Sequence, residues 1–284
     1  MKMYKILIIS MIVLCASCTF FDSFDDEPMF LSFDDNPEVD VDVDLQGEGT
    51  EDIIAVSVFA DGFNIGVFGL PADVPVLDDN DNTDISVRAV IENNAQVDNP
   101  LAYPFYAPLE FNRPFSPGET IDVEPEFRYV DGIQFLLVED FEEDHTITEN
   151  IDGEESFVIE RVSDSRSGQF SGSITTSEDN PFFEKGTLNT FVAADINNTF
   201  AYLELDYRND VPFRVGVLGI IGGTAQRVYK IQLTTTDEWK KLYLDITPEI
   251  LANNFDFYKV IFSNLPGDTD FGTVQFDNIK LITF

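Results

Sequence analysis

Residues 53–68 read IIAVSVFADGFNIGVF, and this stretch decides the fold of the first half of the chain. Ile53 to Ala60 is an apolar run rich in β-branched residues, which favour strands. Asp61-Gly62 follows, and a second apolar run begins at Phe63. An Asp-Gly pair between two such runs is a strong signal of a β-hairpin, because glycine adopts the positive φ of a tight turn. The stretch therefore predicts an antiparallel hairpin.

This hairpin opens a first unit that extends over residues 53–130. Many prolines interrupt the unit and exclude long helices. Its size lies within the range of single domains. We therefore expect a small β-sandwich, with further strands at Val74–Leu77, Ile85–Glu92, Tyr103–Phe111 and Thr120–Tyr129.

Residues 131–284 form a second and larger unit. Short segments of alternating apolar and polar residues recur there between turn residues, which is typical of a β-sandwich or jelly roll. One helical turn is predicted near Thr247, with this threonine as N-cap and Pro248 at the first helical position. The predicted fold class is all-β, a small β-sandwich followed by a larger jelly-roll β-sandwich.

The composition excludes one class of partner and indicates how the core is built. The chain has 16 Lys and Arg against 53 Asp and Glu, a formal net charge of −37. Nucleic-acid binding by phosphate neutralisation needs basic patches and is therefore excluded. The hydrophobic fraction of 44% is too high for a disordered acidic protein. Phenylalanine, with 27 residues, is expected to fill the core, since a buried Phe brings no polar group that must be satisfied.

The N-terminus has the order of a secretory signal. Met1 to Lys5 is short and basic, an apolar run follows from Ile6 to Leu14, and small residues precede Cys18. The apolar run is too short for a transmembrane helix. Leu14 to Cys18 resembles a bacterial lipobox, except that Cys15 stands where an aliphatic residue is usual. An ordinary signal peptide with an accidental cysteine is the alternative.

This resemblance implies that residues 1–17 are removed as a signal peptide and that Cys18 carries the lipid. The protein would then be lipid-anchored in the outer membrane. Cys15 would leave with the signal peptide, so no free thiol would remain in the mature chain. Catalysis by a thiol and cysteine–zinc sites are accordingly excluded.

Residues 18–52 are expected to form an acidic, solvated tether. No basic residue occurs between Lys5 and Arg88, and runs of like charge repel one another and extend. The acidic residues soon after Cys18 resemble the surface-export signal of Bacteroidetes lipoproteins, which implies exposure on the cell surface. A generic spacer is the alternative.

Several stretches carry a resemblance to known families. Val58 to Pro71 resembles a hairpin of PEGA-type domains. Together with Tyr103–Tyr106, Val138–Glu142 and Phe276–Leu281, it makes the mature chain similar to uncharacterised Bacteroidetes outer-membrane lipoproteins. The second unit also resembles carbohydrate-binding jelly rolls of the galactose-binding type, which often begin with Asp-Phe-Glu and end with Asp-Asn-Ile-x-Leu.

The same resemblance implies a structural calcium ion held by Asp140, Glu142 and Asp277, where the first and last strands of such jelly rolls meet. Exposed carboxylates on two strand edges are the alternative. The loop Asp78–Asp84 also offers the hard oxygen ligands that Ca²⁺ prefers, but it lacks the glycine of an EF-hand and equally fits an acidic hairpin tip. No other cofactor is predicted.

Enzymatic activity is not predicted. The single histidine, His145, lies in a polar segment that reads as protein surface, and no Gly-x-Ser-x-Gly motif accompanies it. The many carboxylates leave a glycosidase as a weaker alternative, but no feature of the sequence selects an acid–base pair.

The predicted function is a non-catalytic one, as an accessory subunit that binds a protein partner in an outer-membrane assembly. Aromatic residues are enriched where partners bury a central patch, and Tyr103, Phe105 and Tyr106 are candidate anchors. They could instead seal the contact between the two units. The alternative function is glycan binding by the jelly roll, through Trp239 or through a shallow site at one of three tyrosines, Tyr202, Tyr207 or Tyr229.

Overall fold

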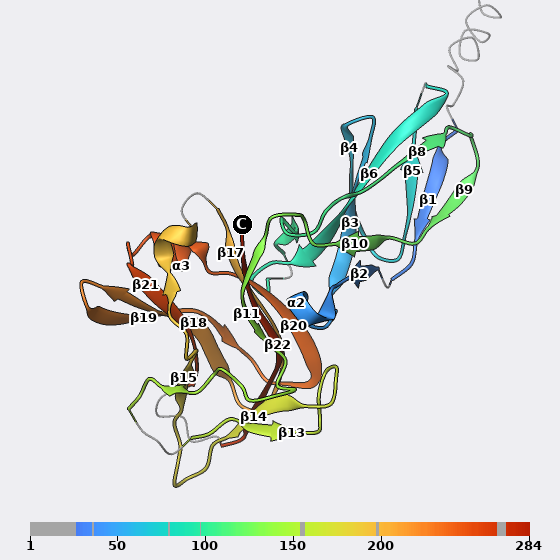
Figure 1. Ribbon diagram of the computed structural model, residues 1–284. Coiled ribbons are helices and arrows are strands. Elements are labelled where there is room, and N and C mark those ends of the chain that lie inside the picture. The colour runs from blue at the N-terminus through green and yellow to red at the C-terminus, as the bar shows by residue number, and fades with distance from the viewer. Residues whose placement is uncertain are drawn as a thin grey trace, which may run out of the picture.

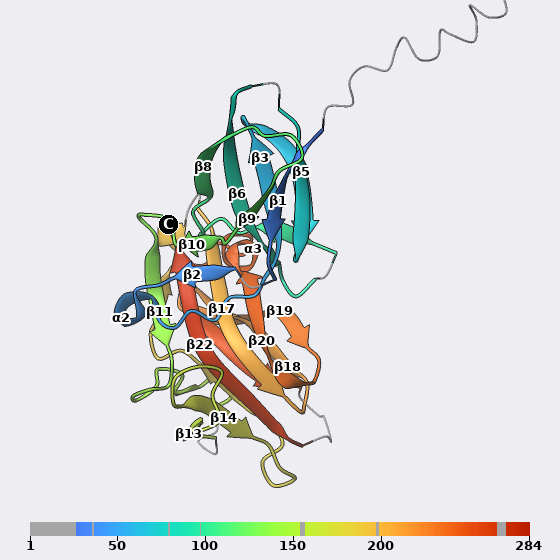
Figure 2. The same ribbon diagram turned by 90° about the vertical axis from the view of Figure 1, so that its right-hand side faces the viewer.

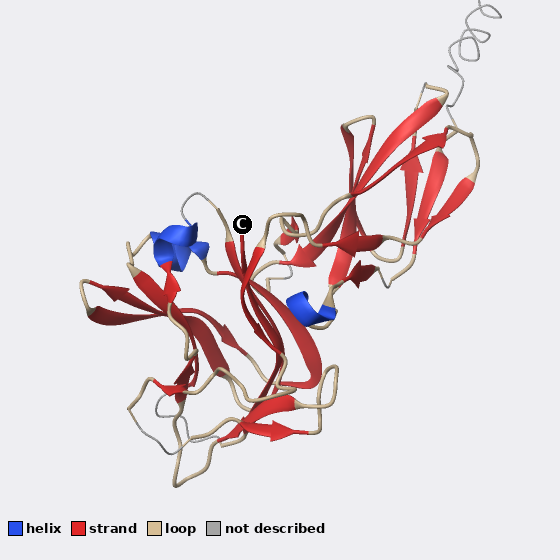
Figure 3. Ribbon diagram, viewed as in Figure 1, coloured by secondary structure: helices blue, strands red, loops and turns tan. Residues whose placement is uncertain are grey.

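The structure is a computed structural model, and it describes residues 27–35, 37–78, 80–96, 98–153, 157–196, 199–265 and 271–284. Strands dominate these residues, with a few short helical segments (Figure 3). The strands form two β-sandwich domains arranged end to end (Figure 1). The predicted all-β fold class is confirmed.

The first domain contains three sheets. Their strand orders are β4-β3-β6-β7 with β8 also paired to β6, β5-β1-β9, and β10-β2. The strands are β1 (Met29–Phe33), β2 (Glu38–Asp40), β3 (Ile53–Ala60), β4 (Phe63–Gly69), β5 (Ala72–Val76), β6 (Asn82–Glu92), β7 (Pro100–Ala102), β8 (Leu109–Pro114), β9 (Thr120–Val123) and β10 (Glu126–Arg128).

The predicted hairpin is β3 and β4. The two strands pair antiparallel, and the turn residues Asp61 and Gly62 both have positive φ, 48° and 78°. Two central residues with positive φ are characteristic of a type I′ turn, whose twist matches that of the flanking strands. The hairpin prediction is confirmed.

The N-terminal part of the predicted tether is a strand of the first domain. β1 lies between β5 and β9, and its residues Met29, Leu31 and Phe33 are fully buried in the domain core. Its five residues alternate between buried and half-buried positions, as in a strand. This strand was not expected from the sequence because acidic residues surround it. The expectation of a solvated tether is therefore wrong from residue 27 onward, and residues 18–26 lie outside the described part of the chain.

The rest of the predicted tether runs from β2 to β3 of the first domain and packs against the second domain on the way. The short helix α2 (Val43–Gln46) is followed by an extended segment, residues 47–52, that lies on the second domain. Lys280 Nζ of that domain donates to the carbonyl oxygen of Glu48 at 2.7 Å, and Lys241 Nζ contacts the hydroxyl of Thr50 at 3.1 Å. This segment is thus a packed part of the structure.

The second domain is a jelly-roll sandwich of two sheets. One has the order β13-β14-β22-β17-β20 with β11 on β22, and the other β12-β15-β21-β18-β19 with β16 on β21. Figure 2 shows β11, β22, β17 and β20 side by side. The strands are β11 (Gln134–Glu139), β12 (Glu149–Asn150), β13 (Glu160–Val162), β14 (Ser171–Thr175), β15 (Glu184–Gly186), β16 (Phe191–Val192), β17 (Ala201–Asn209), β18 (Phe213–Ile221), β19 (Thr224–Leu233), β20 (Thr236–Asp245), β21 (Phe257–Asn264) and β22 (Thr273–Thr283).

Phenylalanine rings from both sheets meet in the core of the second domain. The ring of Phe276 lies 5.4 Å from that of Phe213 and 4.9 Å from that of Phe262, measured between centroids. All three side chains are fully buried. Each such burial stabilises the fold by roughly 1.5–3 kcal/mol. The expectation that phenylalanine fills this core is confirmed.

The predicted helical turn is present as α3 (Thr247–Leu251). Its first residue is Thr247, so the N-cap is Ile246 and not the threonine as predicted. The Thr247 hydroxyl instead accepts a hydrogen bond of 2.9 Å from the backbone N–H of Ala201. The Thr247 side chain therefore makes a contact with a distant strand and does not cap the helix as the local pattern predicted.

Candidate functional site

The aromatic residues predicted to anchor a protein partner lie inside the contact between the two domains. Tyr103, Phe105 and Tyr106 are 3%, 0% and 7% exposed. The ring of Tyr103 lies 5.3 Å from that of Tyr202 and 4.9 Å from that of Tyr243, both in the second domain. No partner can reach these side chains in this structure, so the open alternative, that they seal the contact, is the one observed.

Charged groups are buried beneath these rings. Glu204 accepts hydrogen bonds from the hydroxyls of Tyr103, at 2.7 Å, and Tyr129, at 3.2 Å. Lys241 Nζ lies 3.5 Å from the Glu204 carboxylate and 3.9 Å from that of Asp206. Burial raises the pKa of Asp206, and the Lys241 charge opposes this shift. The network ties the two domains together and lies too deep for a ligand to reach.

The three carboxylates predicted to bind calcium are engaged by backbone donors. Glu142 Oε1 accepts from the N–H groups of Gln169 and Phe170, at 2.6 and 2.9 Å. Asp140 Oδ1 accepts from the Glu142 N–H at 3.0 Å. Asp277 Oδ2 accepts from the N–H of Arg166 at 2.8 Å.

The first and last strands of the jelly roll do pair, as expected, through β11 and β22. Burial raises the pKa of Asp277 to about 7, and its backbone hydrogen bonds partly oppose this shift. Across the described ranges, no group of three or more His, Cys, Asp or Glu side chains is placed to hold a metal ion. Calcium binding at Asp140, Glu142 and Asp277 stays a prediction.

The described residues of the loop from Asp78 to Asp84 are held by side-chain hydrogen bonds, both within the loop and to β8. Asp78 Oδ1 accepts from the Asn80 N–H at 3.0 Å, and Asp84 Oδ1 accepts from the Asn112 amide at 2.6 Å. Asp79 lies outside the described residues. These carboxylates accept hydrogen bonds from protein groups, which favours the acidic hairpin tip over a calcium-binding loop.

His145 is less exposed than the sequence indicates. Its ring packs 5.8 Å from that of Phe141, and its Nδ1 atom is buried without a hydrogen-bond partner in the described part of the chain. The ring is half-buried, so it lies at the surface with one side packed against Phe141. Among the described residues no carboxylate orients this imidazole, so it lacks the partner that a general base of a triad requires.

Trp239 lies on the outer face of the sheet that contains β20, where the outer face is the one turned away from the domain core. It is half-buried, and the Arg208 guanidinium lies 5.3 Å from its ring centroid. Arg208 is in turn hydrogen-bonded to Gln275 at 2.6 Å. The indole therefore packs against a fixed side chain, as the packing alternative expects.

A second aromatic–arginine contact lies on the outer face of the other sheet. Arg214 of β18 alternates with core residues, so its side chain points outward. The strand register places Arg214 opposite Ser263, and Ser263 opposite Glu184. Arg227 and Tyr229 reach this row from β19. We call Glu184, Arg214, Arg227, Tyr229 and Ser263 the Tyr229 face.

Tyr229 stacks on Arg214 where two strands approach closely. The Arg214 guanidinium lies 4.0 Å from the centroid of the Tyr229 ring, within the range of a cation–π contact. Tyr229 pairs with Gly216, and a Cβ atom on that glycine would lie only 2.3 Å from the carbonyl oxygen of Val228. The glycine thus permits the close approach that brings the ring beside the guanidinium.

Hydrogen bonds hold the charged groups of the Tyr229 face in place. The Glu184 carboxylate accepts from Arg227 Nε, at 2.8 and 2.9 Å, and from the Tyr229 hydroxyl. Arg214 Nη2 donates to Ser263 Oγ at 3.1 Å. Burial and the bond to Glu184 raise the pKa of Tyr229 to about 12, so its hydroxyl keeps its proton at neutral pH.

Of the five residues of the Tyr229 face, Tyr229, Arg214 and Arg227 are partly exposed, whereas Glu184 and Ser263 are buried beneath them. Within the described part of the chain, Nη1 of Arg214 and Nη1 of Arg227 donate to no protein acceptor. Each is free to donate to a ligand oxygen. The side chains that hold these groups are already bonded, so little conformational entropy is lost on binding.

The sequence indicated only one residue of this face. Of the three tyrosines considered for a shallow sugar site, Tyr202 and Tyr207 are buried, and Tyr229 is partly exposed. Arg214 and Glu184 were missed. The one signal for Arg214 is a charged residue within the otherwise apolar run of β18, and Glu184 gave none because its contacts are set by strand pairing far along the chain.

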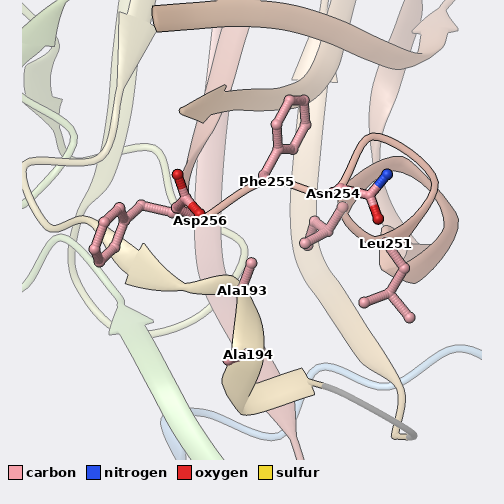
Figure 4. A pocket seen from close by; sticks show the side chains of 8 residues that line it. Ala193, Ala194, Leu251, Asn254, Phe255 and Asp256 are labelled. Carbon is pink, nitrogen blue, oxygen red and sulfur yellow. The ribbon is translucent and has the colours of Figure 1, made fainter. Parts of the chain in front are cut away.

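A separate pocket of about 500 Å³ lies beside α3. Figure 4 shows Ala193 and Ala194, at the junction of β16 and the 3-10 helix η1 (Ala193–Ile196), facing Leu251 and Asn254. Its carboxylate, Asp256, already accepts from the backbone N–H of Gly222 at 2.9 Å. The pocket is mainly apolar and is not lined by residues of the Tyr229 face.

Cys18 and the signal segment lie outside the described residues, so lipid attachment stays a prediction. Among the helices of the described ranges, none has the length and apolar character to span a bilayer.

Comparisons with known proteins find likeness in structure alone. No protein-family model matches the chain, and no curated protein matches its sequence. The family 30 carbohydrate-binding module of a cellulosomal cellulase from Clostridium thermocellum is 18% identical, covering 51% of this chain and 97% of the module, with a TM-score of 0.38.

Two further solved structures are similar to part of the chain. The family 11 carbohydrate-binding module of a cellulosomal cellulase from Clostridium thermocellum is 14% identical over 54% of this chain and 95% of the module, with a TM-score of 0.38. The enzymatically active domain of tailspike protein 4 from bacteriophage CBA120 is 9% identical over 44% of this chain and 17% of that one, with a TM-score of 0.34. Such likenesses concern the fold, and the ligand is inferred below from side chains alone.

Proposed function

We propose that the protein is a non-catalytic, lipid-anchored glycan-binding protein of the outer membrane, and that its second domain binds the glycan at the Tyr229 face. The observation that carries the proposal is the arrangement of Tyr229, Arg214 and Glu184. A ring stacked on a guanidinium lies beside a carboxylate whose position is fixed by two donors. Sugar rings combine apolar C–H faces with hydroxyl groups. The Tyr229 ring complements the first, and the Nη1 groups of Arg214 and Arg227, free within the described residues, complement the second. The buried Glu184 holds Tyr229 and Arg227 in place.

A non-catalytic role is supported by the chemistry of the same face. Of its five residues, Glu184 is the sole carboxylic acid, and it accepts hydrogen bonds from Arg227 and Tyr229. Glycoside hydrolysis by the usual route needs two carboxyl groups on opposite sides of the scissile bond. A role as an accessory subunit in an outer-membrane assembly stays a prediction, and the buried Tyr103, Phe105 and Tyr106 do not supply its contact surface.

Alanine at Arg214 or at Tyr229 is expected to abolish or strongly weaken glycan binding. A side chain at the centre of a binding surface contributes about 2 kcal/mol or more, which corresponds to a loss of about 30-fold in affinity. The glycan is first identified by probing a broad glycan array with the purified full chain. The affinities of wild type and variants for that glycan are then measured by isothermal titration calorimetry.

Arg161→Ala is the matched control for this experiment. Arg161 is also an arginine of the second domain stacked on an aromatic ring, 4.3 Å from the centroid of Phe170, but it lies outside the Tyr229 face. Its variant should bind the glycan like wild type. Equal loss in Arg161→Ala and Arg214→Ala, or an array without any bound glycan, would reject the proposed function.

Replacement of Cys18 by serine is expected to release the protein from membranes. The order of a basic segment, an apolar run and small residues before Cys18 motivates this prediction. Metabolic labelling with a radioactive fatty acid and fractionation of membranes measure the effect. Cys15→Ser is the control and should keep its label. Labelling that persists in Cys18→Ser would contradict lipid attachment at this residue.

A further inference from the structure

The first domain also carries an arginine stacked on an aromatic ring. It lies on the outer face of the sheet formed by β4, β3, β6 and β8. The strand register places Asn64, Phe59, Ser86 and Glu110 in one row across these four strands. Arg88 stands in the adjacent row, with its guanidinium 4.7 Å from the centroid of the Phe59 ring. Phe59, Ser86, Arg88 and Glu110 line a pocket of about 580 Å³.

Three polar side chains that line this pocket, Ser86, Arg88 and Glu110, are free of protein hydrogen bonds within the described residues, as is Asn64 in the same row of the sheet as Ser86. In that part of the chain, these four side chains make no ion pair either. Elsewhere in the molecule, arginines stacked on aromatic rings, such as Arg161 and Arg208, donate to protein acceptors. Among the described arginines that stack on an aromatic ring, Arg88 is therefore the one that donates to no protein acceptor.

We propose that this pocket is a second sugar-binding site, separate from the Tyr229 face, and that it takes a neutral sugar. Arg88 donates hydrogen bonds to ring and hydroxyl oxygens, Glu110 accepts from hydroxyl groups, and Ser86 can do either. Phe59 and Arg88, stacked on each other and both lining the pocket, offer planar groups against which a sugar ring packs.

The charges around the pocket favour a neutral sugar over an acidic one. Asp84 lines it together with Glu110, so two carboxylates face the single guanidinium of Arg88. The whole chain also carries a net charge of −37, which repels anions. A uronic acid would bring its carboxylate into this negative surrounding, whereas the hydroxyl groups of a neutral hexose or pentose meet acceptors there.

The test uses the full chain with Arg214→Ala and Tyr229→Ala combined, in which the Tyr229 face is removed. The probes are neutral hexasaccharides of β-1,4-glucose, α-1,4-glucose, xylose and mannose, with hexagalacturonate as the acidic probe, measured by isothermal titration calorimetry. We expect this double variant to retain binding of a neutral probe at one site. Adding Glu110→Gln or Phe59→Ala should weaken that binding at least about tenfold. The first variant loses the charged acceptor for sugar hydroxyl groups, and the second loses the ring on which the sugar packs.

Arg113→Ala, an exposed arginine of β8 that does not line the pocket, is the matched control and should leave the residual affinity unchanged. Wild-type binding of a neutral probe that disappears in the double variant overturns the second site and leaves the proposed function standing. Binding that depends on Phe59 and not on Tyr229 keeps this site and rejects the proposed one. Tighter residual binding of hexagalacturonate than of every neutral probe overturns the assignment of a neutral sugar.

Discussion

Replacement of Glu204 by alanine is expected to lower the free energy of unfolding by about 3–5 kcal/mol, the usual effect of removing one partner from a buried ion pair. Glu204 is 1% exposed and lies between the two domains. Its loss leaves Lys241 with one carboxylate, Asp206 at 3.9 Å, and leaves the Tyr103 hydroxyl without its acceptor. Unfolding of the full chain by denaturant measures the change.

Two further variants separate charge from packing at this position. Glu204→Gln keeps an oxygen acceptor and removes the charge, so its effect should be smaller than that of alanine. Glu160→Ala, at an exposed residue of β13, is the control and should change stability by no more than about 0.5 kcal/mol. If Glu204→Ala unfolds like the Glu160 control, the charged network does not hold the domains together.

Leu31→Ala is expected to destabilise the protein by about 2–5 kcal/mol, the range for truncation of a buried leucine. Leu31 is fully buried in the core of the first domain, and its strand pairs with β5 on one side and β9 on the other. The mutation therefore leaves a cavity at the centre of that sheet. The midpoint and slope of denaturant unfolding give the loss.

Ser32→Ala is the control for this prediction, because Ser32 lies in the same strand with its side chain on the opposite, half-buried face. It should unfold within about 0.5 kcal/mol of wild type. A solvated tether would give the same stability for both variants, so equal unfolding of Leu31→Ala and Ser32→Ala would contradict the strand assignment.

The sequence predicted the features that depend on neighbouring residues alone, namely the hairpin and the helix α3, together with the phenylalanine core. The hairpin at Asp61-Gly62 follows from the backbone freedom of glycine between two β-branched runs. The helix α3 follows from Pro248, because the fixed φ of proline suits the first turn of a helix and its missing N–H has no partner to lose there. The phenylalanine content indicated the core for a similarly simple reason, the burial of apolar area.

Features that depend on pairing between distant segments were not predictable from the sequence. β1 was hidden because its apolar residues stand within an acidic stretch, and its partners β5 and β9 lie some 40 to 90 residues further on. Glu184 and Arg214 both contact Tyr229 only because β15 and β18 pair with the two sides of β21. Tyr103 carries the same aromatic signal whether it faces a partner or the neighbouring domain, and only the tertiary structure decides between them.

If Cys18 carries a lipid, the position of β1 limits the distance between the membrane and the first domain. From Cys18 to Glu27 the chain has nine steps (27 − 18 = 9), which reach at most about 30 Å when fully extended. A tether that ran to Asp52 would have 34 steps (52 − 18 = 34) and a reach of at most about 120 Å. β1 begins at the end of the first domain that is far from the second (Figure 1). An acyl chain on Cys18 would therefore hold the first domain close to the bilayer. The first domain would act as a spacer of fixed length, and the Tyr229 face would lie on the domain farther from the bilayer.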